Sequence, residues 1–166
     1  MLFNKSKTSA PKKELKLIQL FTFAEVPVAR IPAGALLWGD PGWWPAAGPF
    51  KFSKITNGDE GLGTQYDFQL AGFLAPAGIS EVTQYEPRQV IERTFRRGFF
   101  VGYEVVQISE RANGTRIDYE MHYQVTGVVQ RLLWDVFYKK KFILAVEAVL
   151  EALKQDVVKP HDKDQA

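Results

Sequence analysis

Residues 115–155, TRIDYEMHYQVTGVVQRLLWDVFYKKKFILAVEAVLEALKQ, join an alternating segment directly to a long helical one. Over residues 115–125 every second side chain is apolar, and these are Ile117, Tyr119, Met121, Tyr123 and Val125. The side chains between them are charged or polar. A period of two with one apolar side predicts a strand in a sheet that has one buried face and one face exposed to solvent.

The segment after this strand is predicted to be one long helix, because residues 128–155 contain neither Gly nor Pro. It would run about 40 Å, long enough to cross a whole sheet. Its expected buried stripe consists of Leu132, Val136, Ile143, Val146, Leu150 and Leu153. Lys139, Lys140 and Lys141 interrupt that stripe, so this turn should face water or an opening. A solvated helix surface is the simple interpretation, and docking to a membrane surface is the alternative.

N-terminal to this strand and helix, the sequence predicts one strand, then a segment interrupted by Pro and Gly, and then a series of strands. Alternation predicts strands over residues 14–24, 50–55, 63–73, 79–87, 89–95 and 99–110. Pro27, Pro32 and Gly34 favour two short, broken helices between the first strand and the second. The predicted fold class is therefore α+β, with a curved antiparallel sheet of six or seven strands wrapped around the C-terminal helix.

Composition sets limits on the class of protein. The 166 residues are 46% hydrophobic and 24% charged, which is ordinary for one globular domain. We expect a flexible arm over 1–13, the domain over 14–155 and a polar tail over 156–166. A net charge of +2 gives little support for nucleic-acid binding, and no segment is long and apolar enough for stable membrane insertion. We therefore expect a cytoplasmic protein, and the oligomeric state stays open.

The sequence contains no recognisable catalytic or metal-binding motif. Cysteine is absent, which excludes disulfides, thiol nucleophiles and thiolate metal sites. His122 falls on the polar face of its strand and has no set of partners for a metal ion. No serine-hydrolase elbow, phosphate-binding loop or dinucleotide motif occurs. We predict neither a metal nor a cofactor.

Three stretches, WGDPGWWPA (38–46), YEPRQVIERTF (85–95) and ISERANGTRIDYEM (108–121), carry a resemblance to a known family. In this order the chain resembles the SRPBCC superfamily, in its polyketide cyclase/dehydrase and lipid-transport branch, over about residues 14–155. That group is related to START domains and to the birch-pollen allergen. The resemblance implies the helix-grip fold, with space left between the bent sheet and the straight helix. Members of the group hold apolar or amphipathic molecules in that space.

Several aromatic and aliphatic residues are candidates for the wall of such a cavity, with ordinary core packing as the alternative for each. Trp43 and Trp44 lie in a Gly- and Pro-rich loop that sits near the cavity mouth in the family. The inward strand faces supply Tyr66, Phe68, Phe95, Tyr119, Met121 and Tyr123. The first half of the long helix, which faces the cavity in the family, supplies Leu133 and Phe137. Phe137 is the contact that we expect most from this helix.

Two charged residues are weak catalytic candidates. Glu104 shares a strand face with Val106 and Ile108, so it would point inward if they do, and burial would raise its pKa. Arg93 shares a face with Ile91 and Phe95 and could anchor an anionic headgroup. The alternatives are an outward Glu in a salt bridge and an outward or snorkelling Arg.

Three functional hypotheses follow from these residues and from the resemblance. The first is binding or transport of a hydrophobic or amphipathic small molecule, such as a lipid or an aromatic, polyketide-like compound. The second is a cyclase or dehydratase that uses the same cavity, with Glu104, Arg93 and the tyrosines as the first candidates for moving protons. The third is an interaction module whose interior is filled.

Overall fold

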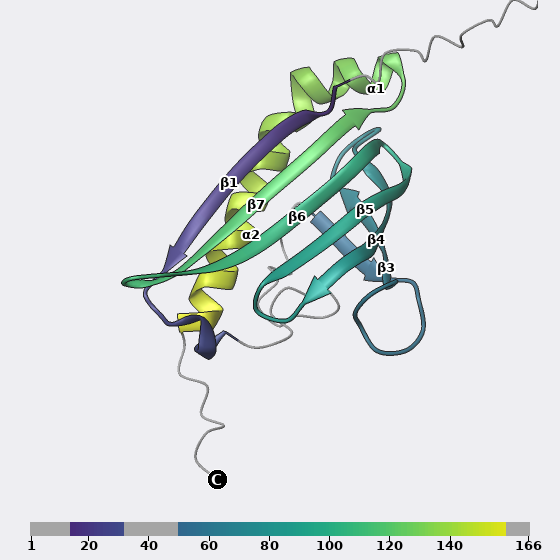
Figure 1. Cartoon of the computed structure of the whole chain (residues 1–166). Helices are drawn as coiled ribbons and strands as arrows, with labels where there is room; N and C mark the ends of the chain where they lie inside the picture. The colour runs from purple at the N-terminus through teal and green to yellow at the C-terminus, as the bar shows by residue number, and fades with distance from the viewer. Residues whose placement is uncertain (1–13, 32–49, 159–166) are drawn as a thin grey trace, which may run out of the picture.

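The computed structural model describes residues 14–31 and 50–158, and within them a sheet backed by a C-terminal helix (Figure 1). The elements are β1 (Lys16–Ala24), η1 (Val28–Arg30), β2 (Phe50–Lys54), β3 (Gln65–Leu70), β4 (Ala77–Glu86), β5 (Val90–Gly98), β6 (Phe100–Arg111), β7 (Gly114–Val125), α1 (Val128–Leu133), η2 (Trp134–Tyr138) and α2 (Lys139–Val158). The predicted strands and the C-terminal helical region are thus confirmed.

The described strands form one antiparallel sheet in the order β1-β7-β6-β5-β4-β3-β2. Neighbours in sequence are neighbours in the sheet, except that β1 joins the far edge beside β7. In Figure 1, α2 runs down behind β1 and β7, so the sheet curls around the helix. This is the predicted helix-grip architecture.

A glycine in β6 lets the backbones of two neighbouring strands approach closely. Gly102 lies in β6 between Phe95 and Tyr123 of the neighbouring strands, with a φ of 125°. A Cβ at this position would lie 2.0 Å from the carbonyl oxygen of His122, which no side chain tolerates. Glycine in a strand interior is typical of such a close approach, because any other residue would push the strands apart.

The core lies between the sheet and the helix. On β7 the alternation is complete, because residues 115, 117, 119, 121, 123 and 125 are buried and those between them are half-exposed. The expected inward face of this strand is therefore confirmed. The helix contributes Trp134, Tyr138, Phe142, Val146, Leu150 and Leu153 to the same core.

The C-terminal helix differs from the prediction in its first ten residues. It is interrupted by η2, a π-helical turn, and α1 lies along the upper end of the sheet before α2 turns down across it (Figure 1). Leu132 and Val136, expected in the buried stripe, are exposed, and Trp134 and Tyr138 are buried instead. A π-turn holds more residues than an α-turn, so a stripe spaced for an α-helix loses its register upstream of it.

Some expectations fall outside the described residues. These are the arm over 1–13, Trp43 and Trp44, and the second of the two short helices. Of the residues 156–166 expected as a polar tail, 156–158 belong to α2, and 159–166 lie outside the described residues.

Candidate functional site: a buried carboxylate beside a small hollow

Glu104 and Arg93 point into the interior of the fold. They are register partners on β6 and β5, and their side chains meet with Arg93 Nη1 3.5 Å from Glu104 Oε1. Glu104 is 5% exposed and Arg93 is 0% exposed. The interpretation of both as outward surface residues is therefore wrong. The strand parity that places Val106 and Ile108 inward also places Glu104 inward.

A phenol and a second aromatic ring complete this buried polar cluster. The Tyr119 hydroxyl donates a hydrogen bond of 2.9 Å to Glu104 Oε2. The guanidinium carbon of Arg93 lies 5.8 Å from the centre of the Tyr66 ring. The sheet thus places a carboxylate between a cation and a hydroxyl donor.

Burial shifts the pKa values of the three titratable groups in this cluster. Burial raises the pKa of Glu104, and the nearby Arg93 and the Tyr119 hydrogen bond oppose that shift. Burial also lowers the pKa of Arg93 to about 10, against the attraction of Glu104. The pKa of Tyr119 is raised, first by burial and then by the neighbouring carboxylate. Glu104 is therefore a carboxyl group whose neutral form is favoured more than it is in water.

Glu104 and Tyr119 line a small hollow between the sheet and α2. Its volume is about 10 Å³, which is room for about one water molecule. The other walls are five phenyl rings, Val146 and the Ser80 hydroxyl, the rings being Phe52, Phe68, Phe95, Phe100 and Phe142. Ser80 is buried, and its Oγ has no hydrogen-bond partner among the described residues. The interior is thus much better filled here than the fold resemblance implied.

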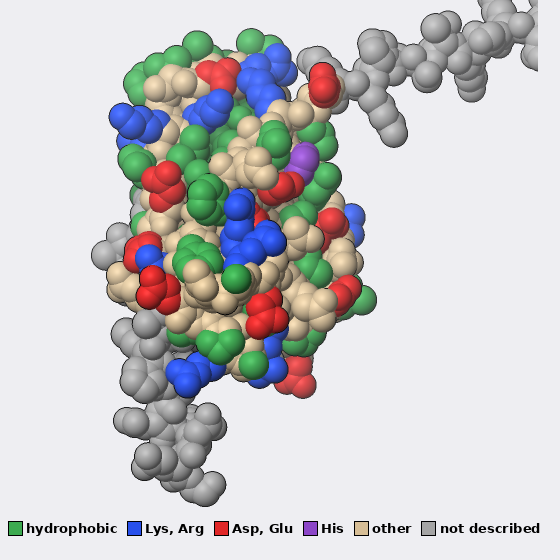
Figure 2. Space-filling view, turned by 60° about the vertical axis from the view of Figure 1, so that its left-hand side comes forward, with side chains coloured by type: hydrophobic (Ala, Val, Ile, Leu, Met, Phe, Trp, Pro, Cys, Tyr) green, Lys and Arg blue, Asp and Glu red, His purple; other side chains and the backbone are tan. Residues whose placement is uncertain are grey.

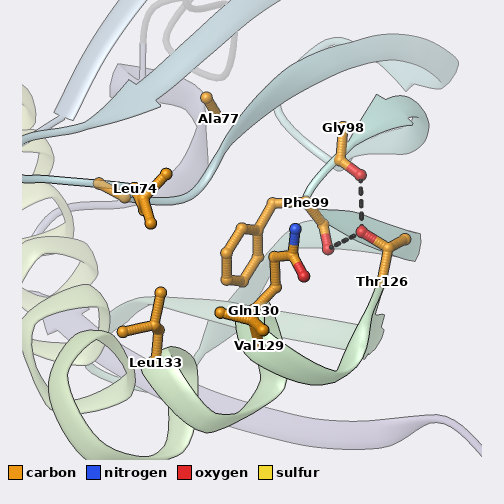
Figure 3. A pocket seen from close by; sticks show the side chains of 9 residues that line it. Leu74, Ala77, Gly98, Phe99, Thr126, Val129, Gln130 and Leu133 are labelled. Atoms are coloured by element: carbon orange, nitrogen blue, oxygen red, sulfur yellow. Dashed lines mark hydrogen bonds between the residues drawn. The ribbon is translucent and has the colours of Figure 1, made fainter.

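A larger cleft of about 230 Å³ lies at the upper end of the sheet (Figure 3). Leu74, Ala75 and Ala77 form one side, and Phe99, Val129, Gln130 and Leu133 form the other. The Thr126 hydroxyl lies 3.1 Å from the carbonyl oxygen of Gly98 and 3.2 Å from that of Phe99, which ties α1 to the β5–β6 turn. An apolar cavity of about 150 Å³ is large enough for benzene. This cleft can therefore hold a small aromatic molecule.

Aromatic rings separate the cleft from the interior hollow. Phe99 lines the cleft and Phe100 lines the hollow, with their ring centres 5.0 Å apart. Trp134 packs on both, at 6.1 Å from Phe99 and 4.9 Å from Phe100. Its indole Nε1 donates to the Tyr123 hydroxyl at 3.1 Å. The rings of Phe99, Phe100 and Trp134, which we call the aromatic partition, are the material between the two spaces.

The predicted cavity residues are distributed unevenly over these spaces. Phe68, Phe95 and Tyr119 line the interior hollow, and Leu133 lines the cleft. Tyr66, Met121 and Tyr123 are buried and line neither space. Phe137 is 58% exposed and lines neither, because η2 turns Trp134 and Tyr138 inward in its place. Trp43 and Trp44 lie outside the described residues.

Sequence reasoning missed several wall residues. Ser80 could have been found, because it alternates with the apolar Val82 on one strand face. Phe142 lies four residues after Tyr138, at helical spacing. Phe99 and Phe100 carried no comparable signal, since both of these adjacent side chains are buried at the turn between β5 and β6.

Metal-binding clusters and membrane-spanning helices are absent from residues 14–31 and 50–158. In these ranges no group of three or more His, Asp or Glu side chains could hold a metal ion. No helix in the same ranges combines the length and the apolar character needed to cross a membrane.

Comparisons with known proteins identify the fold. No family model matches the chain, and no curated protein matches it. Among solved structures, KanY protein (ms6282) matches with a TM-score of 0.68 at 13% identity, over 87% of this chain and 99% of that one. The protein TTHA0849 from Thermus thermophilus matches with a TM-score of 0.63 at 14% identity, over 86% and 97%. Ara h 8.0201 matches with a TM-score of 0.57 at 13% identity, over 87% and 98%.

These similarities define the class of fold. The chain has a curled antiparallel sheet around one C-terminal helix, which is the helix-grip fold that the resemblance of the sequence motifs implied. At this level of identity the likeness concerns the fold alone.

Proposed function

We propose that the protein binds a small, largely apolar molecule that carries a hydroxyl group, with the hydroxyl on Glu104 and the apolar body among the surrounding phenyl rings. The observation that supports this most is the buried cluster of Glu104, Tyr119 and Arg93 beside a hollow. A buried ion pair seldom stabilises a fold more than apolar residues of the same size would. A charged cluster in this core is therefore better explained by a bound polar group than by folding.

The order of the charges indicates the kind of ligand. Glu104 lines the hollow, whereas Arg93 does not and lies beside the carboxylate. An incoming group therefore meets a hydrogen-bond acceptor before it meets the cation. The Ser80 hydroxyl faces the same space and adds a second polar contact. This arrangement favours alcohols and phenols over fatty acids and other carboxylates, which Glu104 would repel.

The two hollows suggest how the body of the ligand is accommodated. The interior hollow has room for one hydroxyl group, and the cleft has room for a small ring system. The aromatic partition lies between them and is made of side chains that can rotate. The proposal is that a ligand enters at the cleft, displaces the rings of Phe99 and Phe100, and then reaches Glu104.

A specific observation also favours a second candidate, an enzyme of the cyclase or dehydratase type. Burial raises the pKa of Glu104, and general acids and bases are commonly tuned in this way. Native mass spectrometry of protein purified from its own host would test this candidate. If Glu104 drives a dehydration, the Glu104→Gln variant should retain a molecule heavier by one water than the one on the wild type. Identical retained molecules would contradict it.

The ligand class is tested with three probes of one size, namely naphthalene, 2-naphthol and 2-naphthoate. We expect 2-naphthol to bind about tenfold more tightly than naphthalene, because a hydrogen bond to a carboxylate is worth roughly 1.5–3 kcal/mol. We expect 2-naphthoate to bind most weakly. Isothermal titration calorimetry and thermal shift at neutral pH measure these differences.

The control for this experiment uses two glutamates of the same strand. Glu104→Gln should remove the preference for 2-naphthol, whereas Glu110→Gln, at an exposed site, should keep it. Equal binding of 2-naphthol and 2-naphthoate would overturn the ligand class but not the binding function. Failure of all three probes would count against binding in this interior altogether.

A further inference from the structure

Large apolar side chains gather on the surface at the upper end of the molecule. We call this surface the apical cluster and define it as Phe73, Val128, Val129, Leu132, Val136 and Phe137. Their exposed fractions lie between 58% and 85%. Figure 2 shows hydrophobic side chains along this end of the molecule, with lysine and arginine side chains close below them. Scattered exposed apolar residues are ordinary, but a contiguous patch of this kind is typical of an interaction surface.

The helix under the apical cluster is apolar on its outer face as well as on its inner face. Trp134 and Tyr138 of η2 pack into the core, while Val128, Leu132 and Val136 face outward. A surface helix normally carries polar residues on its outer face. An apolar outer face on a helix that already has a buried inner face indicates a second apolar environment.

The fold fixes the exposed position of Phe73. The Tyr138 hydroxyl donates a hydrogen bond to the Phe73 carbonyl oxygen. Gly72 has a φ of 138°, and a Cβ there would lie 2.8 Å from the same hydroxyl. Leu74 has a φ of 51°, which is rare for a leucine and stores strain. A loop that is anchored and strained so that a phenylalanine faces solvent is organised for contact with a partner.

The helical segment under the apical cluster carries more cations than carboxylates. Over residues 126–144 the chain has four cations, Arg131, Lys139, Lys140 and Lys141, against one carboxylate, Asp135. Asp135 lies 3.6 Å from Lys16 of β1, so its charge is already matched. Arg131, Lys140 and Lys141 are exposed. The partner is therefore expected to be apolar at its centre and anionic around it.

We infer that the apical cluster docks on a lipid surface with anionic headgroups. A protein partner would be expected to meet about one hydrogen bond per 100–200 Å² of interface. The six side chains of the cluster have no hydrogen-bonding group, and the β3–β4 loop, AGFLAP, has no polar side chain. Apolar side chains rimmed by Lys and Arg are the composition of helices that lie in the headgroup region of a bilayer.

Docking in this way would place the cleft against the lipid. Val129 belongs to the apical cluster and lines the cleft, and Leu74, next to Phe73, lines it from the other side. The inference does not depend on the proposed ligand, because vesicle binding is measured without one. It concerns adsorption to a bilayer surface and requires no helix that spans it.

Sedimentation with large vesicles tests the inference on the full chain. We expect binding to phosphatidylcholine vesicles with about 30% phosphatidylserine, and weaker binding at about 0.5 M salt, where charges are screened. Phe73→Ser with Phe137→Ser should lower the partition coefficient at least about tenfold. Lys140→Gln with Lys141→Gln should lower it by a similar factor on the anionic vesicles alone.

The matched control is Leu62→Ser, which alters a leucine that is 74% exposed in the loop between β2 and β3, outside the cluster. This variant should bind vesicles like the wild type. Three results would overturn the inference. One is equal vesicle binding by wild type and the Phe73→Ser/Phe137→Ser variant. Another is a dimer in light scattering that this variant dissociates, since a second copy would then cover the cluster. A large loss of thermal stability in the variant would place the cluster inside the fold.

Discussion

Glu104 is the residue whose environment departs most from what a folded core requires. It is a carboxylate inside a sheet, paired with a buried Arg93 at 3.5 Å and bonded by Tyr119. Removing one partner of such a pair leaves the other charge buried without compensation, which commonly costs about 3–5 kcal/mol. The cluster is thus held together as a unit, and any ligand that reaches Glu104 acts on Arg93 and Tyr119 as well.

The raised pKa of Glu104 predicts a characteristic pH dependence of stability. The folded protein keeps the Glu104 proton above pH 4.5, the ordinary value of this group, whereas the unfolded chain has released it. The free energy of unfolding should therefore fall as the pH rises through this window, by about 1.4 kcal/mol for each unit of pKa elevation. Urea unfolding between pH 4.5 and 8 measures this effect.

The comparison with variants isolates Glu104 from the other carboxyl groups. The free energy of unfolding of the wild type minus that of the Glu104→Gln variant should decrease with rising pH and then level off. Glu110→Gln should follow the wild type. Arg93 does not contribute in this range, because its pKa is about 10. A difference that stays constant or increases with pH would contradict the raised pKa.

At the scale of elements, η2 decides which residues of the helix face the core. Its π-helical turn places Trp134 in the aromatic partition and Tyr138 under the β3–β4 loop. It also leaves Val136 and Phe137 on the outside. One local irregularity thus builds the wall between the two hollows and the apolar surface above them.

Gly102 is the element-scale position where we expect the largest effect of a small substitution. Gly102→Ala should lower the free energy of unfolding by about 3 kcal/mol, because its Cβ would meet the backbone of β7 at 2.0 Å. Gly58→Ala is the matched control, since Gly58 also has a positive φ but no atom lies within 4 Å of its Cβ position. It should cost about 1 kcal/mol. Equal losses in urea unfolding would show that the close approach of β6 and β7 is unimportant.

At the scale of the whole molecule, the proposed ligand site in the interior and the apical cluster on the outside are two separate regions. The cleft connects them in space, but Phe73 and Phe137 line neither hollow. A helix-grip fold places its helix across the sheet, so the ends of the sheet remain open to other contacts. Apart from Val129, which belongs to both the cleft and the apical cluster, recognition of a ligand and attachment to a surface are therefore expected to depend on different residues.

This separation predicts that the Phe73→Ser/Phe137→Ser variant still binds ligand in solution. With 2-naphthol at about a hundred times its dissociation constant, unfolding should become about 2.7 kcal/mol more costly by mass action. The gain should be the same in the wild type and in the variant, as measured by the change in urea midpoint. A variant that gained no stability from the probe would mean that the two surfaces form a single site.

The sequence by itself determined the strands and the buried face of β7, but not the buried face at the start of the C-terminal helix. Alternation over residues 115–125 predicted β7 and its buried side, because a strand turns every second side chain the same way. The same parity could have decided the direction of Glu104, since Val106 and Ile108 are buried as expected. The order of elements was enough for the fold class, because antiparallel neighbours and one long helix have few ways to pack.

The tertiary structure alone decided how the interior is filled. The pairing of Glu104 with Arg93 depends on the register between β5 and β6, which no single strand specifies. The inward position of Trp134 and the outward position of Phe137 depend on a π-turn, whose cost is offset by contacts with Phe99, Phe100 and Tyr123. The volume of each hollow depends on how side chains from several different elements pack together. It therefore cannot be predicted from the periodicity of the sequence.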